Sequence, residues 1–328
     1  MLLQELTRLS GVSGNEDSVR EFLRHTLAPV AAGFREDPLG SLIVDKGASL
    51  PGPRVMLCAH MDEVGFLITA LDQDGTLCCR PLGGIDPRAA ASKVVLVGPR
   101  RVPGVLRIRD DYARGRIDAG FDSAEEAARV VTPGDFAVFA TESELLGDRR
   151  CKAKALDDRA GCAVLAAVLQ ETYAIPVVGV FSVQEETGMR GAAAAVRHVL
   201  PDLAIVLEGT VCSDVPGVPA SKHATTQGRG PAISIADRTS AFDVALSERL
   251  VALAQERGIP CQRRRISGGG NDGGVIHTAG KGVPCATLSV PTRYIHGPVS
   301  MVHRDDFDHA VALLTAFLHE LEENRHAH

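Results

Sequence analysis

The chain has 328 residues, of which 45% are apolar, and its formal net charge is −6. This length predicts one large or two ordinary globular domains with a substantial core. The charge is spread along the chain without a basic stripe or an acidic tail. That distribution argues against nucleic acid or an anionic membrane as the main partner.

The compartment is predicted from the N-terminus and the cysteines. The first 19 residues carry charges within their apolar stretch and lack a small-residue cleavage pattern, so we expect no signal peptide. No apolar run is long enough to span a bilayer. The eight cysteines are scattered and none forms a CxxC pair, which favours reduced thiols in a cytoplasmic protein over a disulfide framework.

The predicted elements alternate between helix and strand. Residues 13–27 predict an amphipathic helix that opens the chain, because Ser13 stands three residues before Glu16 at capping-box spacing. Short apolar runs at 53–58, 176–183, 203–207 and 286–290 are typical of strands covered on both faces. Helical patterns lie at 162–172, 190–200, 243–258 and 307–323. This alternation predicts a layered α/β domain with a mainly parallel central sheet.

One stretch of the chain has a different pattern. Short β-like runs at 93–98, 102–108 and 135–140 are punctuated by Gly and Pro, with one short helix expected at 123–130. We therefore expect a small β-rich domain at 69–154, inserted between two parts of the α/β domain at 1–68 and 155–328.

Side chains capable of chemistry follow each of the four predicted strands, where ligands gather in open α/β sheets. In chain order they are His60, Asp62 and Glu63, then Glu185 and Glu186, then Glu208, and finally His296, with Asp157 and Asp158 at a helix start. Each alone has an ordinary explanation as a helix cap or a surface residue. Together they would form a costly pool of negative charge unless cations fill it.

The types of ligand narrow the choice of cation. Nitrogen and oxygen donors without thiolates suit Zn²⁺, Co²⁺ or Mn²⁺. The donors suffice for two ions about 3.5–4 Å apart that share a bridging carboxylate and a water. Such a pair activates the water near neutral pH, and a nearby carboxylate that binds no metal is needed to accept its proton.

These motifs resemble the tetrahedral (TET) aminopeptidase family, a group of co-catalytic metallo-exopeptidases that includes glutamyl aminopeptidases and proteins once labelled cellulase M. The matching segments cover nearly the whole chain: LSGVSGNE, AHMDEVGF, KALDDRAGC, VQEETGMRGA, LEGT with DVPG, GGGNDGG and GVPCATLSVPTRYIHGPVS. The resemblance implies hydrolysis of the N-terminal peptide bond of short peptides. It also implies a homo-oligomer, with dimer contacts through the inserted domain and often a hollow tetrahedral dodecamer.

The resemblance also implies ligands for two divalent ions in each subunit, with Zn²⁺ expected ahead of Co²⁺ or Mn²⁺. His60 and Glu208 correspond to ligands of one ion, and His296 and Glu186 to ligands of the other. Asp157 corresponds to the carboxylate that bridges both ions.

Three further residues take roles from the same resemblance. Glu185 matches the general base, and Asp62 matches the carboxylate that orients the ring of the neighbouring histidine ligand, as metal-bound imidazoles generally need. Asp272 is expected to meet the peptide amine. The chain departs from the common family residues at Glu208, Asn271, Gly297 and Ser300. The departures at Gly297 and Ser300 concern the substrate pocket rather than the metals.

Three other functions stay open at this point: a metal-dependent deacylase of N-acyl amino acids, an endoglucanase-like glycoside hydrolase, and a non-catalytic metal-loaded assembly protein. A glycosidase fits less well, because its carboxylates work without histidines or a metal. Only 4% of the residues are aromatic and none is Trp, which leaves little to stack on sugars. The glycine-rich segment 268–274 lacks the Lys-Ser/Thr of a P-loop, so we expect a backbone loop near the substrate. No basic cluster decides which N-terminal residue is preferred.

Overall fold

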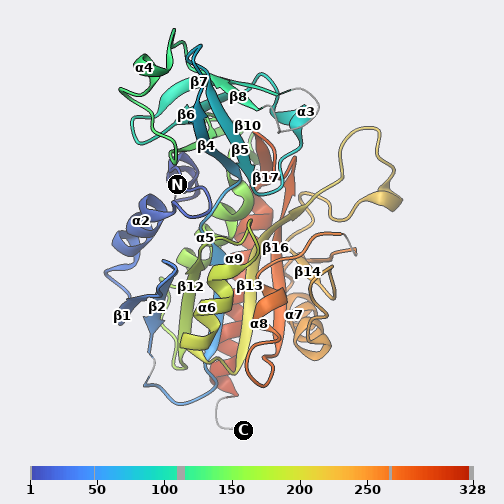
Figure 1. The fold of residues 1–328 in the computed structure, drawn as a ribbon. Helices are drawn as coiled ribbons and strands as arrows, with labels where there is room; N and C mark the ends of the chain where they lie inside the picture. The colour runs from blue at the N-terminus through green and yellow to red at the C-terminus, as the bar shows by residue number, and fades with distance from the viewer. Residues whose placement is uncertain (1, 48, 109–114, 266–267, 325–328) are drawn as a thin grey trace.

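The computed structural model describes residues 2–47, 49–108, 115–265 and 268–324. Over these ranges a layered α/β part contains one large sheet, and a small closed barrel stands at one end of it (Figure 1). The predicted fold class, an α/β domain with an inserted β-rich barrel, is confirmed.

The large sheet has eleven strands in the described part of the chain. Its main path, in spatial order, is β1 (Gly33–Glu36), β2 (Leu42–Lys46), β12 (Val177–Ser182), β3 (Val55–His60), β13 (Leu203–Val211), β16 (Cys285–Arg293), β17 (Ser300–His303), β11 (Arg150–Ala153) and β10 (Glu144–Leu146). Off this path, β14 (Ala232–Ser234) pairs with β16 and with β15 (Gln262–Arg263). The four central strands run parallel, whereas both edges are antiparallel.

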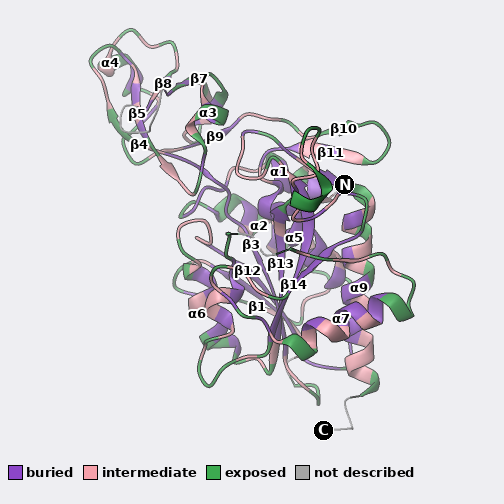
Figure 2. Ribbon diagram, turned by 90° about the vertical axis from the view of Figure 1, so that its right-hand side faces the viewer, coloured by how far each residue is buried: buried purple, intermediate pink, exposed green. Residues whose placement is uncertain are grey.

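The centre of the sheet is buried because its strands are apolar on both faces. Every residue of β3 and β12 is buried. Within β3 the side chains alternate, so that Leu57 joins the core on one face and Met56 and Cys58 join the core on the other. Figure 2 shows these buried strands enclosed by helices whose outer sides are exposed. The last residues of these two strands, His60 and Ser182, are polar and lie at the edge of the sheet.

Helices cover both faces of the sheet. The first core is the one that contains Leu57. The helices packed with it are α1 (Leu2–Arg8), α2 (Asp17–Leu27), α5 (Leu156–Val168), α7 (Val244–Glu256) and α9 (Arg304–Glu323). The second core packs against α6 (Arg190–Val199) and α8 (Gly273–Ile276). Of the described helices, α5 lies deepest, because nearly all its residues are small or apolar and buried. A short 3₁₀ helix lies at Ala220–Lys222.

The barrel has its own apolar core. Its closed path is β4 (Gly65–Leu71), β5 (Leu77–Leu82), β8 (Arg116–Asp118), β7 (Val102–Arg107), β6 (Val94–Val97) and β9 (Phe136–Phe139), with the short helices α3 (Pro87–Ala90) and α4 (Ala124–Ala127) beside it. Phe66 and Phe139 meet edge to face inside, with ring centroids 5.6 Å apart. Strands β10 and β11 follow the barrel in sequence but pair within the large sheet. The domain limits at 69 and 154 stay a prediction.

The start of the chain differs from its prediction. A first helix, α1, precedes the predicted one, and α2 begins after Glu16 without a side-chain cap. The capping box is therefore wrong, because tertiary contacts use both of its side chains. Ser13 Oγ donates to Asp62 Oδ2 at 2.6 Å, and Glu16 Oε1 accepts the backbone N–H of Gln184 at 3.1 Å. None of the described helices is both long enough and apolar enough to cross a membrane.

Candidate metal centre

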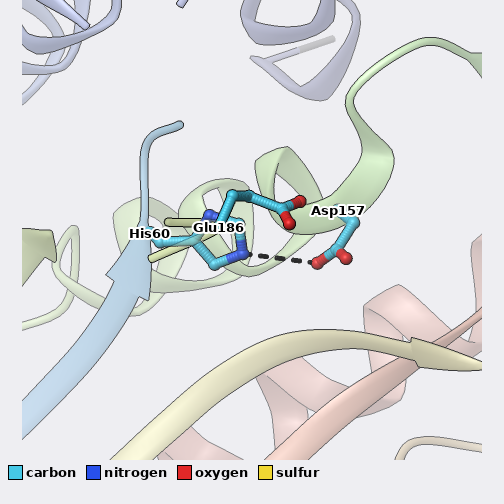
Figure 3. Close-up of side chains that lie close together, drawn as sticks. All are labelled: His60, Asp157 and Glu186. Carbon is cyan, nitrogen blue, oxygen red and sulfur yellow. Dashed lines mark ion pairs between the residues drawn. The ribbon is translucent and has the colours of Figure 1, made fainter. Parts of the chain in front are cut away.

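The predicted ligands come together where the parallel strands end. His60 is the last residue of β3, and its neighbour in the register is Ser182 at the end of β12. Glu186 lies in the loop after β12, and Asp157 lies at the start of α5. Figure 3 shows the side chains of His60, Asp157 and Glu186 converging from separate elements. A parallel sheet places the carboxyl ends of its strands at one edge, and that edge carries the site.

Asp157 lies between the two histidines. Its Oδ1 is 3.4 Å from His60 Nε2, and its Oδ2 is 3.1 Å from His296 Nε2. Each histidine also faces a glutamate: His60 Nε2 is 3.7 Å from Glu208 Oε2, and His296 Nε2 is 3.4 Å from Glu186 Oε1. The structure thus brings these five predicted residues together, with one carboxylate shared by two histidines.

The separations suit ions held between the donors. Two atoms that each lie about 2.0–2.1 Å from a tetrahedral ion are about 3.3 Å apart. Three carboxylate oxygens, Asp157 Oδ1, Glu186 Oε1 and Glu208 Oε1, are buried and make no hydrogen bond within the described part of the chain. Buried oxygens normally have a partner, so these three are suited to bind a cation. The possible ligand groups overlap: His60, Asp157 and Glu186 form one, and His60, Asp158 and Glu208 form another.

The protonation of the site shows the same excess of negative charge. Burial, together with the charge of Asp157, raises the pKa of Glu186 to about 7. Burial also raises the pKa of Glu208 well above its usual range. Burial would lower the pKa of His296, but a hydrogen bond with Asp157 and the charge of Glu186 raise it to about 9. Without a cation these groups must share protons, and a bound divalent ion would take the place of those protons.

Asp62 ties the His60 ring to the loop that carries the glutamates. Its backbone oxygen lies 3.0 Å from His60 Nδ1, and its Oδ1 lies 3.4 Å from the same nitrogen. The two carboxylate oxygens accept the backbone N–H groups of Glu185 and Glu186 at 2.9 and 3.1 Å. Burial opposes its charge, but these partners and Ser13 hold the pKa of Asp62 below its usual value. The ionised form of Asp62 is therefore favoured, and its role in orienting the His60 ring stays a prediction.

Glycines let the surrounding backbone approach the site. A Cβ on Gly209 would lie 2.9 Å from Asp157 Oδ1, which is closer than side chains pack. On the barrel side, a Cβ on Gly83 would lie 3.3 Å from Glu186, and one on Gly84 would lie 3.6 Å from His296 Nδ1. The loop that leaves β5 of the barrel therefore borders the site, so both parts of the chain shape it.

A cavity of about 250 Å³ opens beside the predicted ligands. Its lining includes Glu185, whose carboxylate is not among the predicted ligands and whose pKa is raised well above the usual range by burial and by the charges of Asp272 and Glu186. Residues 269–271 of the glycine-rich segment also line it. A carboxyl group beside the donor cluster, facing an open cavity, can exchange a proton with a bound molecule.

Asp272 lies away from this opening. Its side chain is fully buried, and its Oδ2 accepts hydrogen bonds from Ser182 Oγ at 2.5 Å and from Cys58 Sγ at 3.6 Å. Burial raises its pKa to about 6. Both of these partners belong to the central strands, and Asp272 is not among the residues that line the cavity. Its contact with a peptide amine stays a prediction.

Sequence reasoning left two contributors without a role. Asp158 accepts the backbone N–H groups of His60 at 3.2 Å and of Gly161 at 2.8 Å, so it fixes the strand end and the helix start together. Its position next to Asp157 was the available signal. Arg264 lines the cavity. It stands within a run of three arginines, and no pattern in the sequence separates it from the other two.

Comparison with known proteins agrees with this geometry. The family model described as M42 glutamyl aminopeptidase matches residues 40–313. A putative aminopeptidase of Escherichia coli K12, FrvX, is 34% identical, with 97% of this chain and 94% of that protein covered.

Two solved structures have the same fold over nearly the full length. An aminopeptidase of the archaeon Desulfurococcus kamchatkensis is 34% identical and superposes with a TM-score of 0.94, covering 97% of this chain and 94% of that one. The TET1 peptidase of Pyrococcus horikoshii is 30% identical, with a TM-score of 0.86 and coverage of 96% and 97%.

Proposed function

Because this chain belongs to the M42 glutamyl aminopeptidase family and is a metal-dependent hydrolase that acts on peptide bonds, we propose that it removes the N-terminal residue of short peptides with two divalent ions per subunit. The observation that carries this proposal is the set of three buried carboxylate oxygens, without a hydrogen bond in the described part of the chain, around two histidine nitrogens. Such a set needs cations, and an open cavity lies beside it.

In this proposal the five converging side chains hold the ions. His60 and Glu208, 3.7 Å apart, would hold one, His296 and Glu186, 3.4 Å apart, would hold the other, and Asp157, near both histidines, would be shared. Nitrogen and oxygen donors suit Zn²⁺ first, with Co²⁺ and Mn²⁺ as alternatives. When bound, such ions polarise the scissile carbonyl and lower the pKa of a water molecule.

The chain's own residues divide the remaining work. Glu185, which lines the cavity, takes a proton from the attacking water and passes it to the leaving nitrogen. Asp62 keeps His60 in the ligating orientation and holds the backbone of Glu185 in place. The backbone N–H groups of the two glutamates bind different oxygens of Asp62, and in this proposal Glu186 would ligate while Glu185 transfers protons.

The proposal extends to assembly and location. The TET1 peptidase of Pyrococcus horikoshii can assemble into a tetrahedron or a large octahedral shell. We propose that this chain forms dimers through its barrel domain and builds a homo-oligomer of that kind in the cytoplasm. Neither nucleic acid nor a membrane is part of the proposal.

A substrate panel tests the proposed reaction. The protein is stripped of metal, reloaded with Zn²⁺, Co²⁺ or Mn²⁺, and assayed on aminoacyl p-nitroanilides, their N-acetylated forms, N-acyl amino acids and cello-oligosaccharides. We expect hydrolysis of the free-amine substrates only, lost in EDTA and restored by metal.

Each other outcome selects one of the alternatives. Preference for N-acyl substrates would indicate a deacylase, and cello-oligosaccharide hydrolysis that survives EDTA would indicate a glycosidase. No turnover with any ion would leave a non-catalytic metal-loaded protein.

A further inference from the structure

The glycine-rich wall of the cavity rests on a separate loop, residues 237–240. The backbone N–H of Arg238 in that loop donates to the carbonyl oxygen of Gly269 in the wall at 2.9 Å. A Cβ on Gly270 would lie 2.6 Å from Thr239 Oγ1, which is closer than side chains pack. The loop and the wall are therefore in direct contact, and a side chain at this glycine would push them apart.

The carboxylate of Asp237 shapes the loop. Its Oδ1 accepts the backbone N–H groups of Thr239 at 2.7 Å and of Ser240 at 2.8 Å. The N–H of Asp237 itself donates to the carbonyl oxygen of Ser240 at 3.0 Å, and Ala236 pairs with Ala241 across the base of the loop. One oxygen of the carboxylate is thus used inside the loop, as is usual for Asp in tight turns.

The other oxygen of Asp237 joins the loop to the cavity wall. Its Oδ2 accepts a hydrogen bond from Nδ2 of Asn271 at 3.3 Å, and Asn271 is a buried residue that lines the cavity. Oδ1 of Asn271 accepts the backbone N–H of Gly273 at 2.8 Å. A carboxylate only accepts and a backbone N–H only donates, so a single orientation of the Asn271 amide satisfies both neighbours.

We propose that Asp237 and Asn271 are positioning residues for substrate binding, because their hydrogen bond fixes the glycine-rich wall against which the N-terminal end of a peptide lies. This inference rests on the proposed aminopeptidase function and adds the residues that hold one wall of its cavity. Neither side chain is a predicted metal ligand or the predicted general base. The pair therefore acts on the binding of the substrate rather than on the chemical step.

The composition of the wall determines which effect a displacement should have. At positions 269 and 270 the wall can touch a substrate only through main-chain atoms, because glycine has no side chain. Contacts of this kind do not distinguish one apolar side chain from another. Contacts that are equally strong in the bound substrate and in the transition state change KM and leave kcat nearly constant.

The direction of the hydrogen bond allows a test by exchange. Asp237→Asn would set two amide N–H groups against each other, because its oxygen is still needed by the N–H groups of Thr239 and Ser240. Asn271→Asp would instead set two carboxylate oxygens against each other. The double variant restores one donor and one acceptor with the direction reversed. It also keeps one carboxylate in the pair, so the net charge does not change.

Steady-state kinetics on alanyl and leucyl p-nitroanilides compare the metal-reloaded wild type with D237N, N271D and the double variant. We expect each single variant to raise KM by about ten- to a hundredfold for both substrates, the effect of one hydrogen bond to a charged group. Metal content and kcat should stay close to the wild type. The double variant should recover most of the loss in KM, which a double-mutant cycle measures directly.

Asp74→Asn is the matched control. Asp74 Oδ1 accepts the N–H of Thr76 at 3.1 Å and its hydroxyl at 2.7 Å, which is the same turn motif as in Asp237 and Thr239, but Asp74 is exposed and lies in the barrel. This variant should leave KM and kcat unchanged. Asn271→Ala removes the donor without opposing two like groups, so it should raise KM and should not be rescued by D237N.

Two measurements separate substrate binding from folding and from turnover. Urea unfolding of every variant shows whether a loss of activity is a loss of the fold. Calorimetric titration with L-leucine reports binding without hydrolysis, and we expect it to weaken in both single variants and to recover in the double variant.

The outcomes are distinct. Additive losses in the double variant, a wild-type KM in both single variants, a loss confined to kcat or to metal content, or a loss confined to one of the two substrates would each overturn the positioning role while leaving the aminopeptidase function intact. A wild-type protein that hydrolyses no aminoacyl p-nitroanilide would overturn the proposed function and this inference with it.

Discussion

The carboxylate of Asp62 accepts the backbone N–H of Glu185 at 2.9 Å. Because the same residue contacts the ring of His60 through its backbone oxygen, one short segment after β3 positions both a predicted ligand and the predicted general base. A change in either of these two contacts of Asp62 should therefore affect both metal binding and catalysis, but to different degrees.

The two adjacent glutamates should respond differently to the same substitution. We expect Glu185→Gln to keep near-normal metal content and to lose about a hundred- to ten-thousandfold in kcat, because the amide cannot accept the proton. Glu186→Gln should lose metal, since a neutral amide replaces the charged carboxylate whose Oε1 lies 3.4 Å from His296 Nε2. Elemental analysis by mass spectrometry and steady-state kinetics on both variants check this. A fully active Glu185→Gln enzyme would rule out the base assignment.

Asp62 should be needed for metal affinity as well as stability. Asp62→Asn replaces one acceptor oxygen by a donor that faces Ser13 Oγ or the backbone N–H groups of the glutamate loop. We expect metal affinity to fall about ten- to a hundredfold, and the free energy of unfolding to fall by about 1–3 kcal/mol. Metal titration and urea unfolding measure the two effects. Ser13→Ala is the control, because it leaves both backbone donors on Asp62, and it should change metal affinity far less.

Gly209 should be required for the position of Asp157. The Cβ of Gly209→Ala would lie 2.9 Å from Asp157 Oδ1 and 3.1 Å from its Cβ, so the carboxylate must move. We expect a loss of about 1–3 kcal/mol in the free energy of unfolding and a lower metal content. Gly33→Ala is the control, because its Cβ would meet no atom within 4 Å. Thermal unfolding and metal analysis measure the two effects. Equal stability and equal metal content in the two variants would contradict the steric argument.

Stability at alkaline pH should depend on Lys154. Its side chain is fully buried beside Glu63, and burial lowers its pKa from 10.5 to about 8. Between these two values the unfolded chain binds more protons than the folded chain, so the free energy of unfolding should rise with pH. The rise is at most about 3 kcal/mol for a shift of this size.

Urea unfolding from pH 7 to 10.5 compares the wild type with Lys154→Met. The difference between the two curves should grow above pH 8, because the variant lacks this titrating group. Lys152→Met, which changes a more exposed lysine paired with Glu144, should run parallel to the wild type. A Lys154→Met curve parallel to the wild type would show that Lys154 keeps its proton in both states.

Local patterns were sufficient where one element decides the outcome. The runs at 53–58 and 176–183 were predictable as central strands because they are continuously apolar, and they correspond to the fully buried strands β3 and β12. Since parallel strands end at one edge of a sheet, the sequence also predicts that His60 and Glu186 lie near each other. The start of the chain was not predictable in this way: Ser13 has a local option as a helix cap, but Asp62 competes for its hydroxyl from 49 residues away.

The layered α/β class, the β-rich insertion and the placement of His60 and Glu186 at one edge of the sheet were predictable from the sequence alone. These follow from the periodicity of apolar residues and from the geometry of parallel sheets. The position of Asp157 between the two histidines, the hold of Asp62 on the glutamate loop, and the place of Arg264 rather than Arg263 in the cavity wall came only from the folded chain. Each depends on contacts between segments that are distant in the sequence, and local patterns do not encode the distances between such segments.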